Sequence, residues 1–298
     1  MMARLLRRII LMQLLVGIGL GWAVGSAAEV DTGTLIMLMA ATAALTPAVF
    51  KVWLVLLSGV MSGRPGPSNV WWRAMLIECR AAVVIFLLRQ PWSLSPPAFL
   101  APLALPGRIP VLLVHGFVCN YRLWDTLAQD LRRVGHPVLA VNLEPVFASI
   151  DDYGVLIEQA VTELCRQTGA TQVALIGHSM GGLAIRAWMR QQGTTRVARV
   201  ITLGTPHVGT LAEPCPVTPN LRQMALYNPW LKELAASETP ATRGLMRIAL
   251  SAQDNIVFPQ RKQTLDGAAL QVFEGVGHLA LVLDTRVRRW VLAQLDGL

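Results

Sequence analysis

The feature that most constrains the fold of this chain is a serine enclosed by glycines, where an apolar run meets a helix-forming run. Residues 173–176 are apolar in the manner of a buried strand, and residues 183–191 contain helix formers with neither Pro nor Gly. Between them, Gly177-His178-Ser179-Met180-Gly181 has the form G-x-S-x-G. The glycines lack the Cβ atoms that would clash across a sharp turn. The sequence therefore predicts a strained strand-to-helix turn that presents Ser179 as a nucleophile.

A serine hydroxyl is a weak nucleophile at neutral pH, so a base must lie close to it. The chain has five histidines. We predict that His278 is the base, because it lies in a glycine-rich turn between the strand-like residues 269–273 and a C-terminal helix that ends near Leu295. His207, which follows Pro206, is interpreted as a solvated loop residue.

Asp254 is the predicted acid that orients this base. In the chain order Ser, Asp, His, the acid lies between the other two residues. Asp254 follows the apolar residues 245–250, where a carboxylate at a strand end could reach a histidine ring nitrogen and fix its tautomer. Asp266 is predicted to lie in a turn, and Asp284 in a helix or at its cap.

Two backbone amides are the predicted donors to the oxyanion. Residues 110–117 form an apolar strand that ends in His-Gly-Phe, and this turn frees the amide of Phe117. The second donor is the amide of Met180, directly after the serine. The side chains of Phe117 and Met180 are expected to form only the wall of the site.

From about residue 108 to its end, the chain resembles the lipases of the α/β-hydrolase superfamily, in particular the compact bacterial triacylglycerol lipases. The segments that carry the resemblance are Val114-His115-Gly116-Phe117, Gly177-His178-Ser179-Met180-Gly181-Gly182, Thr202-Leu203-Gly204-Thr205-Pro206-His207 with Gly209, and Asp254 with Gly277-His278. The Gly-Thr-Pro-His element is typical of lipases. The resemblance implies an α/β-hydrolase fold with a lipase or esterase activity.

The pattern between these motifs favours a minimal, mostly parallel sheet with helices on both faces. The expected strands are residues 111–114, 138–143, 173–176 and 197–203, and the expected helices are residues 121–134 and a helix capped by Asp151 that runs to about residue 167. Residues 210–243 are rich in turns and contain one amphipathic helix, so a lid or cap is predicted there. Its residues Leu211, Met224, Tyr227 and Trp230 are candidates for an acyl pocket; the alternative is that they simply cover the sheet.

The first hundred residues contain two long apolar stretches. Arg8 and Glu29 bracket twenty uncharged residues, and Asp31 and Lys51 bracket another apolar stretch that continues beyond Lys51. A bilayer core of about 30 Å requires roughly 20 helical residues, so we predict two transmembrane helices. In the alternative, the first stretch is a signal sequence that is removed near residue 28.

The arginines suggest an orientation in the membrane. They precede the first stretch and follow the second, whereas the loop between the two contains Glu29 and Asp31 and neither Lys nor Arg. The positive-inside rule then predicts a multi-pass protein of the inner or plasma membrane with its catalytic domain on the cytoplasmic side. Residues 75–88 are interrupted by Glu78 and Arg80, so we predict an interfacial helix with Trp71 and Trp72 at the headgroups. The alternative, a third span, would place the domain outside.

Composition excludes several other classes of protein. The net charge of +8 is spread along the chain without the basic cluster expected of a nucleic-acid-binding protein. Four cysteines, Cys79, Cys119, Cys165 and Cys215, have neither C-x-x-C spacing nor a histidine cluster, so no metal site is expected. A disulfide between Cys119 and Cys215 is conceivable in an oxidising compartment only. No phosphate loop or dinucleotide motif is present, and no cofactor is expected.

The sequence thus predicts three regions: two transmembrane helices in residues 1–63, an interfacial helix and a Pro-rich linker in residues 64–107, and an α/β-hydrolase domain in residues 108–298. The expected function is a membrane-anchored serine hydrolase of carboxylic esters that acts on acylglycerol-type lipids. A phospholipase or an acyl-thioesterase with the same triad are alternatives, and so is an inactive hydrolase-fold scaffold.

Overall fold

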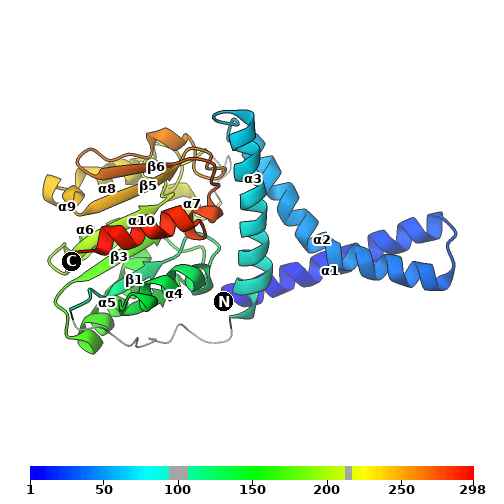
Figure 1. Cartoon of the computed structure of the whole chain (residues 1–298), viewed down its shortest axis with the longest axis horizontal. Coiled ribbons are helices and arrows are strands. Elements are labelled where there is room, and N and C mark those ends of the chain that lie inside the picture. The colour runs from blue at the N-terminus through cyan, green and yellow to red at the C-terminus, as the bar shows by residue number, and fades with distance from the viewer. Residues whose placement is uncertain (94–106, 212–216) are drawn as a thin grey trace.

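A computed structural model of the chain describes residues 1–93, 107–211 and 217–298. A layered α/β domain and an N-terminal helical region are its two parts (Figure 1). The predicted Pro-rich linker and Cys215 lie outside the described residues, apart from Gly107 at the linker's end.

The α/β domain is built on one parallel sheet with the strand order β2-β1-β3-β4-β5-β6. The strands are β1 (Val111–Val114), β2 (Val138–Val141), β3 (Val173–His178), β4 (Val197–Leu203), β5 (Met246–Ser251) and β6 (Ala269–Phe273). Every residue of β1 and β3 is buried, as expected for central strands covered on both faces. The fold predicted from the sequence is confirmed.

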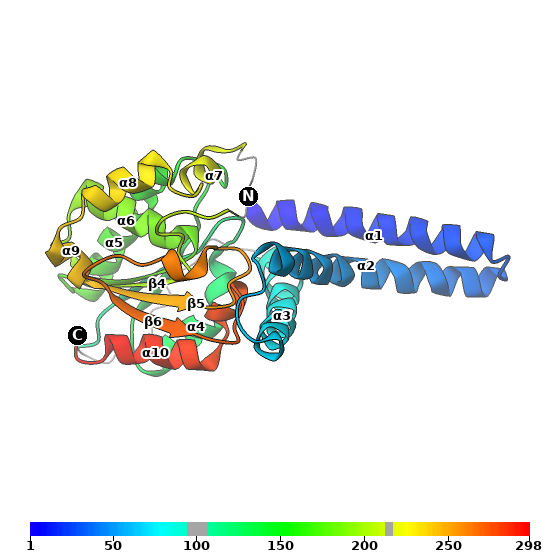
Figure 2. The same ribbon diagram turned by 90° about the horizontal axis from the view of Figure 1, so that it is seen from above.

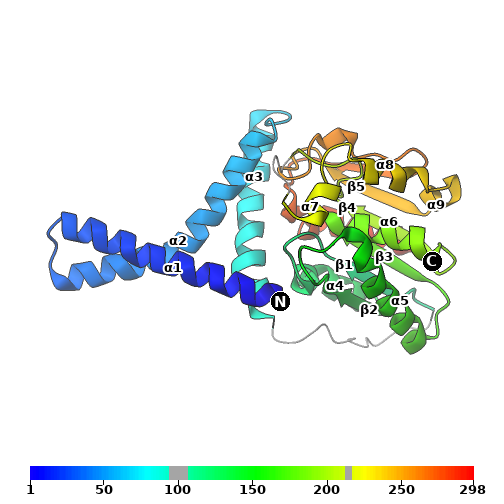
Figure 3. The ribbon, with the colours of Figure 1, turned by 180° about the vertical axis from the view of Figure 1, so that it is seen from behind.

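Helices cover both faces of this sheet (Figures 1 and 3). The helices are α4 (Asp125–Arg133), α5 (Gly154–Thr168), α6 (Met180–Gln192) and α10 (Thr285–Leu295). Leu112 and other side chains on one face pack in a core with α5 and α6, whereas Leu113 points into a second core with α4 and α10. Alternating residues of one strand thus serve two cores.

The start of α5 differs from the prediction. A 3-10 turn over Ile150–Tyr153 precedes the helix, and the residue that caps this turn is Ser149, not Asp151. The Ser149 hydroxyl accepts a hydrogen bond from the backbone amide of Asp151. The carboxylate of Asp151 instead accepts hydrogen bonds from Trp230 Nε1 at 2.8 Å and from Arg190 at 2.6 Å. Asp284, by contrast, caps α10 as one of its two predicted roles requires.

The predicted cap region consists of short helices that begin with proline: α7 (Pro219–Gln223), α8 (Pro229–Ala236) and α9 (Pro240–Gly244). Leu231 and Leu234 of α8 are buried in the core beside α6. This helix therefore packs against α6 with its apolar side.

The N-terminal region begins with an antiparallel hairpin of α1 (Met2–Ala27) and α2 (Thr32–Met61), which projects away from the α/β domain (Figure 2). Both helices are long and apolar enough to cross a membrane, by length and composition. Small residues let them approach closely: a Cβ atom on Gly17 would lie 2.6 Å from Ala43 Cα, and one on Gly21 would lie 2.6 Å from Met39 Cα.

A third helix, α3 (Ser68–Val83), lies across the α/β domain at the base of the hairpin (Figures 1 and 2). It is followed by a π-helical turn, Val84–Arg89. Trp72 is half-exposed, but Trp71 is only 2% exposed, with the Arg64 guanidinium 5.2 Å from its ring. Trp71 therefore packs within the protein and does not face headgroups as predicted, because α3 uses that side to contact α2.

Candidate active site

Ser179 stands at a strained turn between β3 and α6. Its φ of 54° is in the left-handed region, which a residue with a Cβ adopts rarely and which costs of order 1–3 kcal/mol. The turn is possible because its glycines are in close contact with backbone: a Cβ on Gly177 would stand 2.6 Å from Gly182 N. The side chain of Ser179 lines two cavities.

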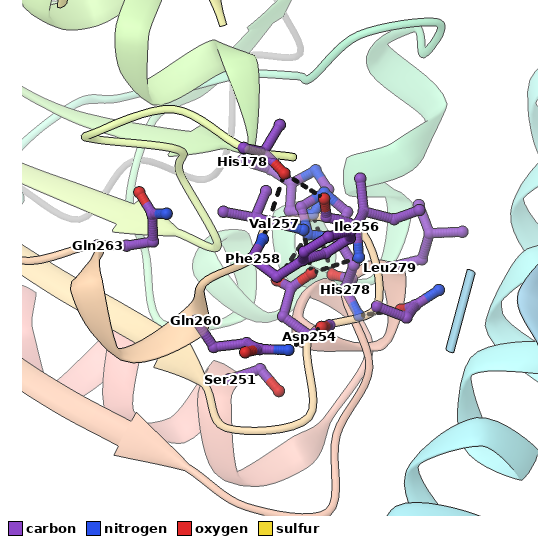
Figure 4. A network of polar contacts seen from close by, with 12 residues as sticks. His178, Ser251, Asp254, Ile256, Val257, Phe258, Gln260, Gln263, His278 and Leu279 are labelled. Atoms are coloured by element: carbon purple, nitrogen blue, oxygen red, sulfur yellow. Dashed lines mark hydrogen bonds and ion pairs between the residues drawn. The ribbon is translucent and has the colours of Figure 1, made fainter. Parts of the chain in front are cut away.

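Asp254 and His278 are brought together from the loops that follow β5 and β6 (Figure 4). His278 Nδ1 lies 2.8 Å from Asp254 Oδ2. The other carboxylate oxygen, Oδ1, accepts hydrogen bonds from the backbone amides of Ile256 at 2.9 Å and Val257 at 2.7 Å. These bonds fix the carboxylate, and the carboxylate in turn fixes the ring of His278, whose Nε2 stays free to accept a proton.

Two opposing effects set the pKa of His278. Burial of the ring lowers this pKa, but the Asp254 carboxylate and its hydrogen bond together raise it by more, so the pKa of His278 lies above its ordinary value. The neighbouring ring of His178, 4.6 Å away between centroids, has its pKa lowered well below the ordinary value by burial. His178 therefore stays neutral beside a ring that can take up a proton.

The loop that carries His278 is held in place by residues of the N-terminal region. Glu78 of α3 is fully buried, and its carboxylate accepts hydrogen bonds from the backbone amides of Leu279 and Ala280, each at 2.8 Å. Burial raises the pKa of Glu78 to about 7, against the effect of those two bonds and of His278. A second link passes through Asn255, which accepts a hydrogen bond from the His278 amide at 3.1 Å and donates one to Ser58 of α2 at 2.7 Å.

Sequence reasoning did not find these contacts. The only signal for Glu78 was a carboxylate within an apolar segment, and that signal was interpreted as an obstacle to membrane spanning.

The loop after β1 passes directly beside the serine. A Cβ atom on Gly116 would lie 2.8 Å from Ser179 Cβ, so only glycine fits there without displacement. Phe117 follows, and it lines both cavities together with Ser179. Met180 is the first residue of α6, where backbone amides have no partner within the helix. Among the described residues, neither the Phe117 amide nor the Met180 amide donates a hydrogen bond.

The two cavities beside Ser179 have different walls. The larger, of about 350 Å³, is lined by α2 and α3 as well as by the α/β domain. The smaller, of about 160 Å³, is lined by Met224 of the predicted cap. Leu211, Tyr227 and Trp230 line neither cavity: Leu211 is 54% and Tyr227 47% exposed, and the ring of Trp230 is tied to Asp151. Part of the apolar wall of the larger cavity thus comes from the N-terminal helices, for which the sequence predicted only a membrane anchor and an interfacial helix.

His207 is buried and not solvated as predicted. Its ring lies between Thr202 Oγ1, at 3.1 Å from Nε2, and Arg186 Nη1, at 3.3 Å from Nδ1. Arg186 forms a buried ion pair with Glu238 at 2.6 Å. Burial, followed by the charge of Arg186, lowers the pKa of His207 well below its ordinary value. His207 therefore has a structural role between β4 and α6.

No group of side chains that could bind a metal ion occurs among residues 1–93, 107–211 and 217–298. Cys79, Cys119 and Cys165 are free thiols. The conceivable partner of Cys119, Cys215, lies outside the part of the chain that the structure describes.

Comparisons with known proteins agree with this architecture. Residues 109–253 match the model of the alpha/beta hydrolase fold family. A triacylglycerol lipase of Burkholderia plantarii is 39% identical over 161 residues, which are 50% of this chain and 42% of that protein. A triacylglycerol lipase of Pseudarthrobacter phenanthrenivorans is 40% identical over 114 residues, 35% of this chain and 34% of that protein. The chain thus matches less than half the length of these curated relatives.

Among solved structures, the mature form of the Bacillus licheniformis lipase BlEst2 superposes with a TM-score of 0.57 at 15% identity, over 64% of this chain and 94% of that one. The propeptide form of the same lipase gives a TM-score of 0.55 at 19% identity, over 64% of this chain and 52% of that one. Taken together, the parallel sheet and the superposition with these lipases show an α/β-hydrolase fold, and the family match covers residues 109–253 of it.

Proposed function

We propose that this protein is a membrane-anchored serine hydrolase of carboxylic esters that acts on acylglycerol-type lipids through an acyl-enzyme. One observation carries the proposal: Ser179, at a strained turn, shares an apolar cavity with His278, whose Nδ1 is held 2.8 Å from Asp254. This combination of nucleophile, base and orienting acid is what acyl transfer requires.

In the proposed reaction, the Ser179 hydroxyl attacks the ester carbonyl while His278 Nε2 accepts its proton. The amides of Phe117 and Met180 donate hydrogen bonds to the oxyanion that forms. As the tetrahedral intermediate collapses, the bond to the leaving alcohol breaks, and His278 returns the proton to that alcohol. A water molecule then attacks the acyl-enzyme while His278 Nε2 accepts its proton. The bond between the acyl carbon and Ser179 Oγ breaks, His278 returns the proton to this oxygen, and a carboxylic acid leaves. Asp254 stabilises the protonated ring in both halves of the cycle.

The apolar wall of the larger cavity supports an acyl chain as the ligand. Leu54, Val55, Ala82 and Phe86 of the N-terminal helices line it beside Phe117. The matched relatives are named triacylglycerol lipases, which agrees with a lipid ester. A thioesterase would use the same residues, and an inactive scaffold would need none of them to be aligned.

The membrane part of the proposal rests on the hairpin of α1 and α2. Large apolar side chains on it, such as Leu15, Trp22, Met37 and Trp53, are exposed to an extent that a bilayer would cover. We propose that residues 1–63 anchor the protein, that residues 64–107 join anchor and enzyme, and that residues 108–298 hydrolyse the substrate. Arginines lie at the start of α1 and after the end of α2, at the base of the hairpin, and this favours the cytoplasmic side for the α/β domain.

A paired measurement tests the hydrolase assignment. The full-length protein in detergent micelles is incubated with a fluorophosphonate probe, and its turnover of a short soluble ester is measured in parallel. We expect labelling and turnover in the wild type and neither in Ser179→Ala, with the same far-UV circular dichroism for both. A folded Ser179→Ala protein that still hydrolyses the ester would exclude Ser179 as the nucleophile.

A further inference from the structure

The larger cavity beside Ser179 extends to Lys51 on α2. Lys51, Val55 and Ser58 follow one another at helical spacing, so one face of α2 borders this cavity over two turns. Ser58, at the inner end of this face, is bonded to the loop of Asp254 through Asn255. Lys51 therefore marks the outer end of a path that leads along α2 to the nucleophile.

The uncharged stretch of α2 before Lys51 bears on the depth of Lys51 in the proposed anchor. Gly17 meets Ala43 and Gly21 meets Met39 in the hairpin, and α2 then passes Pro47 and separates from α1 toward the α/β domain (Figures 1 and 3). At 1.5 Å per residue, the uncharged stretch between Asp31 and Lys51 spans about 30 Å, the thickness of a bilayer core. A bilayer core that begins at Asp31 would thus end near Lys51, on the side of the α/β domain, although exposed apolar side chains continue along α2 to Met61.

The ammonium of Lys51 has no anionic partner among the described residues. The side chain is 9% exposed, and its described polar contact is the face of Phe50, whose centroid lies 5.5 Å from Nζ. Glu78 is the acidic residue that lines the same cavity, and both of its oxygens accept hydrogen bonds from backbone amides of the His278 loop. A buried cation without a counter-ion is costly, and an anionic ligand would relieve that cost.

From these observations we infer that the cavity takes a phosphate-bearing lipid ester, a glycerophospholipid, directly from the adjoining leaflet, and that Lys51 binds its phosphate while an acyl ester reaches Ser179. The inference rests on the proposed function and adds the substrate class to it. The enzyme then selects phospholipids over uncharged acylglycerols with the same chains, because only the former supply a charge-assisted hydrogen bond to Lys51.

The test compares two lipids and two matched variants in vesicles. Full-length protein is reconstituted in vesicles of a non-hydrolysable ether lipid that contain either phosphatidylglycerol or diacylglycerol with identical chains, and kcat/KM is measured for each. In Lys51→Met we expect the ratio of the two values to fall about tenfold or more, and in Lys51→Arg we expect it to be largely retained. Arg8→Met is the control, because Arg8 carries the same charge on the other helix of the hairpin but does not line the cavity.

Each result separates one possibility. An unchanged ratio in Lys51→Met, or an equal fall in Arg8→Met, would overturn the inference, since the second result would indicate general attraction to an anionic surface. If inorganic phosphate inhibited the wild type but not Lys51→Met while kcat/KM was equal for the two lipids, the site would be assigned to a free anion instead of a lipid, and the inference would also be overturned. Turnover of a short soluble ester reports on the proposed function alone. A wild-type protein that does not hydrolyse this ester would refute that function. A wild-type protein that hydrolyses it but shows no preference between the two lipids would refute only the inference.

Discussion

Replacing Gly181 with alanine tests whether the geometry around Ser179 controls turnover. A Cβ atom at this position would stand 2.6 Å from the carbonyl oxygen of His115, 2.8 Å from the carbonyl carbon of Val114 and closer still to the Val114 oxygen. All three are backbone atoms, so no side-chain rotation relieves the clash. Ordinary contacts of a Cβ begin at 3.4 Å, and α6 and the loop of Phe117 must therefore separate by roughly 1 Å, a displacement that can cost about 100-fold in rate.

The assay measures kcat on a soluble ester together with the thermal midpoint in the same detergent. We expect Gly181→Ala to lose about 100-fold in kcat, with a stability cost of about 1–3 kcal/mol for the overpacking. Gly244→Ala is the matched control, because its added Cβ meets nothing within 4 Å. A folded Gly181→Ala protein with the kcat of the wild type would refute the argument that the contact between these loops sets the geometry of the site.

Three further predictions concern the histidines and Glu78. His278→Ala should lose several orders of magnitude in kcat, whereas a folded His207→Ala protein should lose far less. Initial rates on the soluble ester check both, and a larger loss in His207→Ala than in His278→Ala would invalidate the proposed triad. The base must be neutral, and the pKa of His278 lies above its ordinary 6.5, so kcat/KM should rise with pH through a midpoint above 6.5. Asp254→Asn removes the charge that raises this pKa and should therefore lower the midpoint. A midpoint that does not move would contradict the assignment. The folded protein binds a proton on Glu78 more tightly than the unfolded chain, since burial raises this pKa from 4.5 to about 7. The protonated Glu78 side chain therefore contributes about 3 kcal/mol to stability below pH 4.5, and this contribution is lost as the pH rises through 7. Thermal midpoints at pH 5 and pH 8 should therefore differ less in Glu78→Gln than in the wild type, and an equal difference would count against this account.

Local patterns allowed much of the α/β domain to be predicted. The bounds of β4 and β6 agree with the predicted strands, because a short apolar run bounded by turns is a local property. The same holds for the positions of Ser179, Asp254 and His278, since each lies at the end of a recognisable strand or in the loop that follows it. The structure places Asp254 and His278 in contact and Ser179 in the same cavity, and their roles remain proposals.

The errors concern contacts between distant segments. A cap was predicted over residues 210–243, but part of the wall of the larger cavity comes from α2 and α3, which precede the first strand of the sheet in the sequence. Hydrophobic periodicity shows that a helix has an apolar side, and it does not show which surface covers that side. For the same reason Glu78 could be identified as an unusual charge, but its partners, the amides of Leu279 and Ala280, could not.

The central claim, that Ser179 carries the acyl group during turnover, can be tested by trapping that intermediate. The full-length protein is mixed with a slowly deacylating ester at pH 5, quenched in acid, digested and analysed by mass spectrometry. The account predicts one acyl group on the peptide that contains Ser179 and none in Ser179→Ala. An acyl group on another residue, or ester turnover with no acylated peptide at any time point, would contradict it.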